Sequence, residues 1–293
     1  MAESPAHKWG QIIGDFLEEV IEKELSKFAR KHNLFLDKKG PRPARPGKKV
    51  SWMDSFGNSH DLDFVLERNG TAKKLGDPVA FIESAWRRYT KHSRNKAQEI
   101  QGAIMPLIAT HKNFAPFIGV VLAGEFTGGA LNQLKSLGFS VLYFPYDLIV
   151  TGFKKFDLDA GSEENTPDKD FINKIGHWDN FKGKSSLGKY LLKLNSKEVK
   201  TFFQNLEFAV SRYIISVSVT PLFGELFTMT SIGKAIEFIK NHNTSSKKLP
   251  VLKYEIIIRY NNDDKVEGIF ADRDAAIDFL HSFDTPKPKG SKG

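Results

Sequence analysis

The stretch DLDFVLERNGTAKKLGDPVAFIESAWRRYTKHSRNKAQE, residues 61–99, carries the clearest structural pattern in this chain. Two segments read as strands: His60–Leu66, which starts one residue earlier and alternates polar and apolar residues at first, and the mostly apolar Pro78–Ser84. A charged segment follows, and Ser93 suits the N-cap of a helix from about Arg94 to Thr110. The stretch therefore predicts two strands followed by a helix.

The residues before this stretch extend the pattern. An amphipathic helix is expected over Gly10–His32, where apolar residues recur with helical spacing. Val50–Asp54 reads as a strand that the turn SFGNS joins to His60–Leu66, as in a hairpin. The segment between this helix and this strand, Lys38–Lys49 (KKGPRPARPGKK), is expected to be a flexible basic linker.

The residues after the stretch predict a strand, a short helix and another strand. Phe117–Glu125 is nearly all apolar, which is typical of a strand buried on both faces. Gly129–Gly138 reads as a short helix with a glycine C-cap, and Ser140–Phe144 as the next strand. We expect the first three strands to form an antiparallel meander and a helix to cross between the last two. The predicted fold class is α/β (α+β), with a mixed central sheet flanked by helices.

The second half of the chain contains an internal repeat. Tyr213–Ile239 and Tyr254–Leu280 match at a constant offset, and each copy reads as strand, turn, strand and helix. Two such ββα units can share one four-stranded sheet, with both helices on one face, whereas a single unit could not bury its helix.

These patterns divide the chain into four parts. Asp157–Lys184 is polar and charged, and we expect a loop or boundary there. The expected parts are a core over residues 1–156, a connecting segment over 157–200, a smaller C-terminal α+β domain over 201–283 and a disordered tail over 284–293.

Composition limits the classes of protein to consider. The chain has 293 residues, 40% of them hydrophobic and 24 of them Phe, so it can bury a substantial core. The net charge of +8 favours a polyanionic partner. The absence of cysteine excludes disulfides, thiolate zinc sites and cysteine nucleophiles. Without an apolar run of membrane-spanning length or a secretory signal, we expect no membrane association and a cytoplasmic location.

Two acidic residues stand on the neighbouring strands of the opening stretch. Asp63 lies on the first strand and Glu83 at the end of the second. A carboxylate at the end of an apolar strand is costly unless it is paired or bound to a metal. Either acid alone could simply mark a strand end that reaches solvent. Together they predict a divalent metal site, and the basic residues that follow are suited to a phosphate group.

This arrangement resembles the PD-(D/E)XK nuclease superfamily, and within it the type II restriction endonucleases. The resemblance rests on Asp63, Glu83 and the order of elements, and it covers roughly Gly10–Asp147. It implies a restriction endonuclease-like core, a Mg²⁺ cofactor held by the two acids, and hydrolysis of double-stranded DNA. It also implies a homodimer, because such enzymes commonly match a two-fold DNA site with a two-fold protein.

The sequence departs from the family at the motif lysine. The E-x-K position reads Glu83-Ser84-Ala85, so alanine stands where the lysine is expected. Lys96 and Glu99 share a face of the next helix, and Lys96 could supply the missing ammonium. Glu99 resembles the migrated acid of CCGG-cutting restriction enzymes. The alternative is that these two residues form an ordinary solvated helix pair.

Further candidate site residues come from the first helix and from the basic stretch. Family members often place an acid of the first helix near the metal, and Glu18 is the candidate, with Glu19 and Glu24 as alternatives; surface placement is the ordinary expectation for all three. The basic stretch Trp86–Arg94 is interleaved with aromatic residues, which suits contact with phosphates and guanine edges. The alternative is that it is only a solvated loop. The expected DNA-binding residues are Arg87, Arg88, Lys91, His92, Arg94 and Asn95.

Three functional hypotheses remain open at this stage. The first is a Mg²⁺-dependent, sequence-specific endonuclease of double-stranded DNA, whose C-terminal repeat reads DNA or mediates dimerisation. The second is a non-catalytic DNA-binding protein on a nuclease fold, which Ala85 favours. The third is an RNA-processing nuclease, which differs only in substrate.

Overall fold

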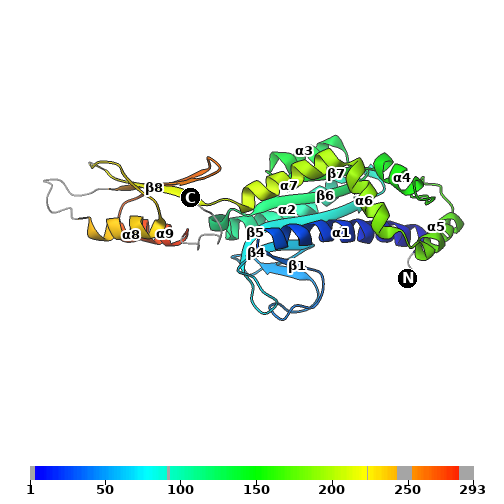
Figure 1. Ribbon diagram of the computed structural model, residues 1–293, viewed down its shortest axis with the longest axis horizontal. Helices are drawn as coiled ribbons and strands as arrows, with labels where there is room; N and C mark the ends of the chain where they lie inside the picture. The colour runs from blue at the N-terminus through cyan, green and yellow to red at the C-terminus, as the bar shows by residue number, and fades with distance from the viewer. Residues whose placement is uncertain (1–3, 91–92, 223, 243–252, 284–293) are drawn as a thin grey trace. The chain divides into compact units, whose positions relative to one another are not determined.

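The structure is a computed structural model that describes residues 4–90, 93–222, 224–242 and 253–283 (Figure 1). The chain divides into two compact units, Met1–Val210 and Ser211–Gly293, and each is described by itself. The tail predicted to be disordered, residues 284–293, lies outside the described residues. No helix among the described residues is long and apolar enough to cross a membrane.

The first unit is built on a mixed five-stranded sheet with the order β1-β4-β5-β6-β7. Its strands are β1 (Phe35–Lys38), β4 (Phe64–Arg68), β5 (Asp77–Arg87), β6 (Phe117–Gly124) and β7 (Ser140–Pro145). β4 is antiparallel to both β1 and β5, whereas β5, β6 and β7 run parallel. This sheet confirms the α/β class and the mixed sheet that the sequence predicts.

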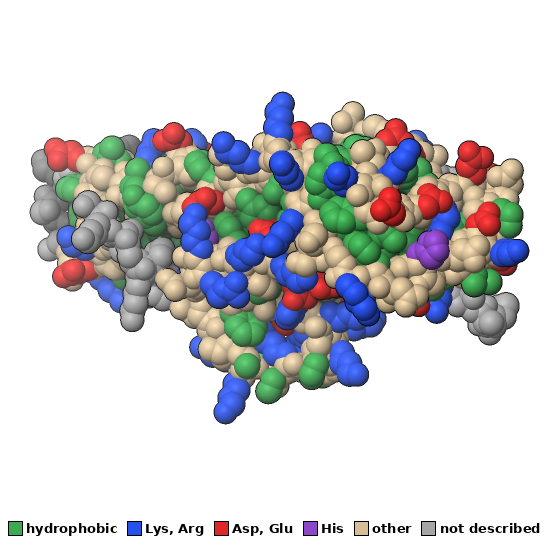
Figure 2. Space-filling model, turned by 45° about the vertical axis from the view of Figure 1, so that its right-hand side comes forward, with side chains coloured by type: hydrophobic (Ala, Val, Ile, Leu, Met, Phe, Trp, Pro, Cys, Tyr) green, Lys and Arg blue, Asp and Glu red, His purple; other side chains and the backbone are tan. Residues whose placement is uncertain are grey.

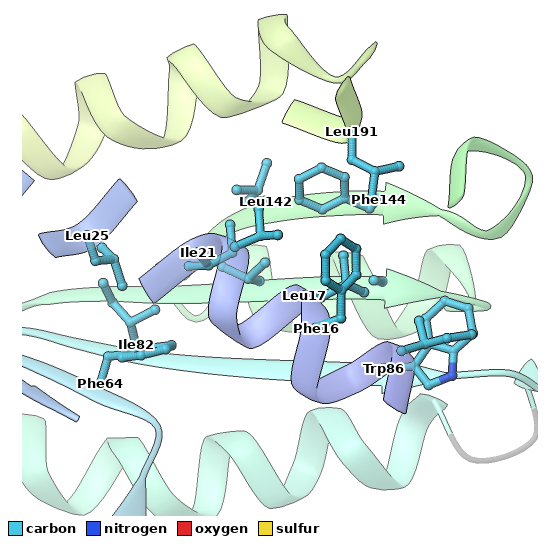
Figure 3. Packing of buried hydrophobic residues seen from close by; sticks show 14 of the residues in the cluster. Phe16, Leu17, Ile21, Leu25, Phe64, Ile82, Trp86, Leu142, Phe144 and Leu191 are labelled. Atoms are coloured by element: carbon cyan, nitrogen blue, oxygen red, sulfur yellow. The ribbon is translucent and has the colours of Figure 1, made fainter. Parts of the chain in front are cut away.

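Helices cover both faces of this sheet. On one face, Leu17, Ile21 and Leu25 of α1 (Pro5–Lys31) pack among apolar side chains of the sheet, including Ile82 and Leu142 (Figure 3). α1 starts earlier than expected because Ser4 caps it and Pro5 occupies its first turn, where proline is favoured.

The opposite face is covered by α2 (Ser93–Thr110) and α3 (Gly128–Ser136). Ala97, Ile100 and Ile104 of α2 belong to a separate buried cluster on that face. The short 3₁₀ helix η2 (Lys112–Phe114) then leads into β6. The strands β5 and β6 are buried on both faces, which explains their nearly continuous apolar sequence.

The predicted strand His60–Leu66 is in fact two strands, so the two antiparallel pairings of the expected meander are found but lie in separate sheets. β3 (Ser59–Leu62) pairs with β2 (Val50–Met53) in a separate two-stranded sheet, while β4 joins the central sheet. The break falls at Asp63, between the two. Its side chain accepts hydrogen bonds from Ser84 on β5 instead of continuing an alternating strand. The place beside β4 goes to β1, a four-residue strand too short and too polar to recognise in the sequence.

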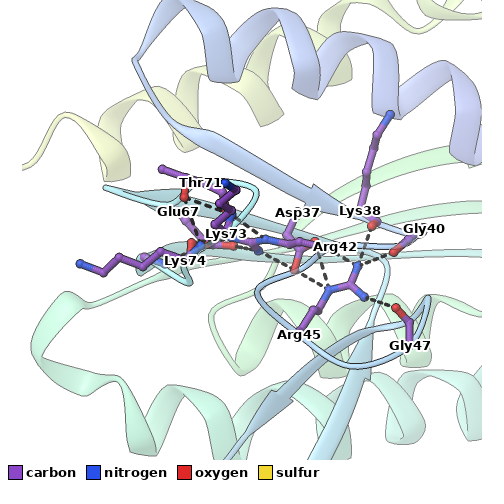
Figure 4. A network of polar contacts seen from close by, with 11 residues as sticks. Asp37, Lys38, Gly40, Arg42, Arg45, Gly47, Glu67, Thr71, Lys73 and Lys74 are labelled. Carbon is purple, nitrogen blue, oxygen red and sulfur yellow. Dashed lines mark hydrogen bonds and ion pairs between the residues drawn. The ribbon is translucent and has the colours of Figure 1, made fainter.

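The segment Lys38–Lys49 is not a flexible linker, because two of its arginines are buried (Figure 4). Arg42 Nη1 lies 2.9 Å from an oxygen of Asp37, and Arg42 Nη2 lies 2.9 Å from an oxygen of Glu67. Arg45 Nε lies 3.0 Å from the same Asp37 oxygen, Oδ2, that Arg42 contacts. These ion pairs hold the segment in a defined path against β1 and β4.

The expected loop Asp157–Lys184 is only partly correct, because Asp168–Asn180 within it forms a helix. α4 (Tyr146–Lys154), α5 (Asp168–Asn180), α6 (Lys184–Leu194) and α7 (Ser196–Val210) follow β7 and belong to the first unit. Trp178 of α5 is buried with its ring centroid 5.0 Å from that of Phe16 and 5.7 Å from that of Phe153. The polar residues of this segment therefore lie largely on the solvent side of α5, whose apolar face closes the core around α1.

The second unit is a four-stranded antiparallel sheet with the order β11-β10-β8-β9. Its elements are β8 (Ile214–Pro221), β9 (Phe227–Met229), α8 (Ile232–Asn241), β10 (Tyr254–Tyr260), β11 (Lys265–Phe270) and α9 (Arg273–His281). Ile256 and Ile258 of β10 share one buried cluster with Ile236 of α8 and Ile277 of α9. The two copies of the repeat thus pool their apolar faces in one small core.

Candidate active site

Asp63 and Glu83 meet where β4 and β5 pair. Phe64 pairs with Ile82, and continuing this register by one residue puts Asp63 opposite Glu83. Asp63 Oδ2 accepts hydrogen bonds from Ser84 N at 2.6 Å and from Ser84 Oγ at 2.9 Å. Asp63 lies at the break before β4, and its charge contributes to the raised pKa of Glu83, so the two acids are close to each other. The two acids predicted to form the site are therefore adjacent.

The Glu83 carboxylate is in an unfavourable place for a negative charge. The residue is 7% exposed, and its Oε1 atom has no hydrogen-bond partner among the described residues. Burial and, to a lesser extent, the charge of Asp63 raise the pKa of Glu83 to about 8, against the opposing effect of the Lys96 ammonium. A group of positive charge beside Glu83 and Asp63 would relieve both effects.

Glu18 of α1 is electrostatically coupled to the same two acids. Its pKa is raised to about 7, first by burial and next by the charge of Asp63, while Lys39 opposes the shift. The alternatives on this helix face elsewhere: Glu19 pairs with Lys23 and Glu24 with Lys27, both at 2.6 Å. Among the three acids considered for α1, Glu18 is thus the one beside the candidate site.

Lys96 extends from α2 toward this acidic group. Its charge acts on Glu83, and its Nζ lies 3.4 Å from Glu99 Oε2. The Lys96 side chain is 20% exposed, whereas that of Glu99 is 61% exposed and also lies 3.9 Å from Arg87 Nη2. Lys96 therefore bridges the buried acid and the surface, while Glu99 sits at the outer end of this charge series.

A pocket of about 530 Å³ opens beside these residues. α1 lines it with Gly10, Gly14 and Glu18, and other elements contribute Asp63 and Lys96. The two glycines face Trp86: a Cβ atom at Gly10 would lie 3.8 Å from its ring, and one at Gly14 would lie 3.6 Å from its Cβ. Small residues on this turn of α1 leave the space that the pocket occupies. Glu83 is not part of the lining.

The basic stretch after Glu83 is partly fixed by the protein itself. Arg87 and Arg88 line the pocket. Arg88 lies over the rings of Tyr89 and Phe171, at 4.3 and 5.0 Å from their centroids, and Arg87 Nη1 donates to the backbone oxygen of Trp86 at 2.9 Å. These contacts hold two cations at the pocket wall.

The remaining DNA-binding candidates are less constrained. Arg94 and Asn95 are exposed on the first turn of α2. Lys91 and His92 lie outside the described residues. For Arg94 and Asn95, the structure shows no contact with the carboxylates.

Sequence reasoning missed Ser84 and Lys39. Ser84 holds the Asp63 carboxylate, and its only signal was its position directly after Glu83, on the strand next to Asp63. Lys39 lay in the segment expected to be a flexible linker, so nothing connected it with Glu18. The Ser84 contact depends on the register between β4 and β5, and the position of Lys39 depends on β1 lying beside β4; the sequence pattern revealed neither.

The donor set fits a magnesium ion held by few protein ligands. Within the described ranges, no group of three or more His, Asp or Glu side chains is placed to hold a metal by itself. Mg²⁺ usually keeps several waters and binds through one or two carboxylates, which Asp63 and Glu83 can supply. The free Oε1 atom of Glu83 is the observation that supports this fit.

Comparison with known proteins adds no further identification. No protein-family model, curated protein or solved structure matches the chain. The function of this protein is therefore inferred from the geometry of the candidate site.

Proposed function

We propose that this protein is a Mg²⁺-dependent endonuclease that hydrolyses phosphodiester bonds of double-stranded DNA. The observation that carries the proposal is the buried Glu83 carboxylate, whose Oε1 atom has no hydrogen-bond partner among the described residues. Glu83 lies opposite Asp63, and the charge of Lys96 acts on it. A structural acid at such a position is costly, so a functional cation is the simplest account of its presence. The resemblance to a restriction endonuclease-like core supports the same reading.

In this proposal Asp63 and Glu83 hold the metal, with Glu18 as a further acid beside them. A bound Mg²⁺ lowers the pKa of a coordinated water and neutralises charge on a phosphate. Ser84 positions the Asp63 carboxylate through two hydrogen bonds. Lys96 supplies the ammonium that Ala85 cannot, and it acts on the negative charge of the phosphate group. Arg87 and Arg88 at the pocket wall suit the flanking phosphates.

A second candidate function is DNA binding without cleavage, and Ala85 is the residue that favours it. If Lys96 does not reach the reacting phosphate, the site holds a metal but lacks the ammonium of the motif. Sequence specificity, a homodimer and a recognition role of the second unit are further parts of the nuclease proposal. An RNA substrate remains a variant of it.

The test compares Asp63→Ala and Glu83→Ala with the wild-type protein on supercoiled plasmid. We expect Mg²⁺-dependent nicking by the wild type, none in EDTA, and a loss of at least ~100-fold in both variants. Calorimetry with Mn²⁺ should show that the variants lose metal binding. A separate binding measurement with duplex DNA should show that they still bind it. Glu19→Ala is the matched control, since it removes an exposed carboxylate from the same helix as Glu18.

Three outcomes would decide between the hypotheses. Wild-type nicking by both variants would refute the proposed site. An uncleaved plasmid that is still bound would favour the non-catalytic protein. Preferential competition by structured RNA over duplex DNA would identify an RNA nuclease. With phage DNA, discrete bands would indicate sequence specificity and a smear would indicate its absence.

A further inference from the structure

Two loops of the first unit, residues 39–49 and 69–76, are joined into one lobe by the buried arginines. Ala44 N donates to Ala72 O at 3.1 Å, directly linking the loops. Arg42 Nη2 donates to the backbone oxygens of Thr71 and Lys74, at 2.8 and 2.9 Å. Arg45 Nη2 donates to the backbone oxygens of Lys38, the last residue of β1, and of Gly40 in the first loop, at 2.8 and 3.2 Å. The paths of both loops are therefore fixed from within (Figure 4).

The outer surface of this lobe is rich in lysine. We call it the lysine lobe and define it by the exposed residues Lys38, Lys39, Lys48, Lys49, Lys73 and Lys74. Side chains of Lys and Arg stand out around the lower part of the face in Figure 2. Positive charge is thus collected on loops that buried charges hold in place.

Most of this charge is not neutralised by the protein. Lys38 pairs with Glu22, and Lys49 pairs with Asp61 at 2.6 Å. For the other four lysines, no carboxylate among the described residues lies within ion-pair distance. The lobe therefore presents free ammonium groups, which suit a polyanion.

The lysine lobe borders the candidate active site. Lys38 of β1 pairs with Phe64 of β4, and Phe64 is the residue after Asp63. Lys39 lies near enough to Glu18 to lower its pKa. Lys73 and Lys74 belong to the loop that follows the other end of β4. The positive surface thus begins beside the acids and continues along the strand away from them.

We propose that the lysine lobe binds the phosphate backbone of duplex DNA outside the bond that is cut. This inference rests on the proposed function and adds a contact surface to it. Lysine is a point charge that contacts phosphates without reading bases, so the lobe supplies affinity and not sequence specificity. Because Arg42 and Arg45 have already fixed the loops, binding need not pay to order them.

The experiment neutralises three free lysines of the lobe together: Lys48→Gln, Lys73→Gln and Lys74→Gln. Its matched control carries Lys154→Gln, Lys193→Gln and Lys197→Gln, exposed lysines of α4, α6 and α7. Both triple variants lower the net charge equally, so a general loss of attraction affects them alike. Fluorescence anisotropy with a labelled DNA duplex in EDTA, over a series of salt concentrations, gives Kd for the full-length proteins without cleavage.

Each lysine–phosphate contact contributes about 0.9 to the slope of log Kd against log salt. For the lobe variant we expect a slope smaller by about 2 to 3 and binding at least ~10-fold weaker at moderate salt. The control should keep the wild-type slope. Equal changes in the two triple variants would overturn the inference, and so would a lobe variant that loses binding to phosphatidylserine vesicles but keeps its affinity for DNA.

The result is independent of the nuclease test. If the wild type binds DNA through the lobe but never cleaves it, the proposed catalytic function fails and the lobe inference stands. If the wild type cleaves and the lobe variant binds DNA like the control, the inference fails and the nuclease stands. Wild-type protein that does not bind the duplex at all overturns both. Thermal melts of the variants check that folding is unchanged.

Discussion

Ala85 is the residue at which the candidate site departs from the pattern it resembles. The neighbouring Lys96 comes from a different element, α2, but its charge acts on Glu83. If Lys96 supplies the missing ammonium, Lys96→Ala should lower the cleavage rate by about 100- to 1000-fold. A lysine at position 85 should then restore part of it, because Ala85 lines the same pocket.

The swap is measured as plasmid nicking by Lys96→Ala alone and combined with Ala85→Lys. Recovery of at least ~10-fold in the double variant would assign the ammonium to Lys96. Undiminished nicking by Lys96→Ala would remove Lys96 from the mechanism. Lys197→Ala, at an exposed position of α7, controls for loss of a positive charge.

Glu83 also makes stability depend on pH in the metal-free protein. Its pKa rises from 4.5 to about 8 on folding. Below the lower value the acid is neutral in both states, and between the two the folded state retains a proton that the unfolded state has lost. The stabilising contribution is therefore full at low pH and is lost as the pH rises through about 8.

Glu83→Gln should consequently stabilise the metal-free protein at pH 9 and have little effect at pH 5. The expected gain is on the order of a few kcal/mol, set by the size of the pKa shift. Urea unfolding in EDTA at both pH values measures it, with the exposed Glu19→Gln as control. The same difference at both pH values would show that the Glu83 charge is not buried.

The sequence predicts Asp63 and Glu83 because a carboxylate on an apolar strand is conspicuous. It could not predict Ser84 as the partner of Asp63, since that contact needs the pairing of β4 with β5 at a particular register. It also left Glu18, Glu19 and Glu24 undecided. The side chains of one helix point in different directions, and which of them faces the site depends on how α1 lies against the sheet.

At the scale of elements, the buried ion pairs of Arg42 decide whether the two loops of the lysine lobe keep their shape. Removing one member of a buried charge network leaves its partners uncompensated. We expect Arg42→Ala to lower the free energy of unfolding by about 3–5 kcal/mol. Lys48→Ala, in the same loop but exposed, should change it by less than about 0.5 kcal/mol. Urea unfolding distinguishes the two, and equal effects would contradict the role of Arg42.

Elements with strong apolar patterns were predictable, and those with charged sequences were not. The buried strands β5 and β6 can be recognised in the sequence by their apolar composition. The segment with Arg42 and Arg45 looked like a linker because buried arginine is rare and only its partners, Asp37 and Glu67, reveal it. α5 was missed because only Phe171, Ile175 and Trp178 mark its buried face among many polar residues.

Trp178 provides a second test at this scale, since it is the contact through which α5 closes over α1. Its ring lies among Phe16 and Phe153 and is almost fully buried. Trp178→Ala should lower the free energy of unfolding by about 3–5 kcal/mol through the cavity it leaves. The exposed Ile172→Ala of the same helix should have a much smaller effect in the same unfolding measurement. Similar losses would mean that α5 is not held by its apolar face.

At the scale of the whole molecule, the chain has two units with separate cores. The apolar clusters of the first unit contain no residue beyond Val210, and the cluster of the second begins at Val217. Contacts within one core make folding cooperative, and separate cores permit separate transitions. The internal repeat made the second core predictable from sequence. The predicted start of that unit, residue 201, falls too early, because α5, α6 and α7 belong to the first unit, which extends to Val210.

This separation allows the role of the second unit to be tested by division at residue 210. We expect a fragment of residues 1–210 to unfold cooperatively on its own and to retain metal-dependent nicking, because Asp63, Glu83 and Lys96 all lie within it. If the second unit mediates dimerisation, sedimentation should show a monomeric fragment beside a dimeric full chain. If instead it reads DNA, the fragment should stay in the same oligomeric state and turn discrete bands on phage DNA into a smear. A fragment that matches the full chain in both measurements would exclude both roles for the repeat.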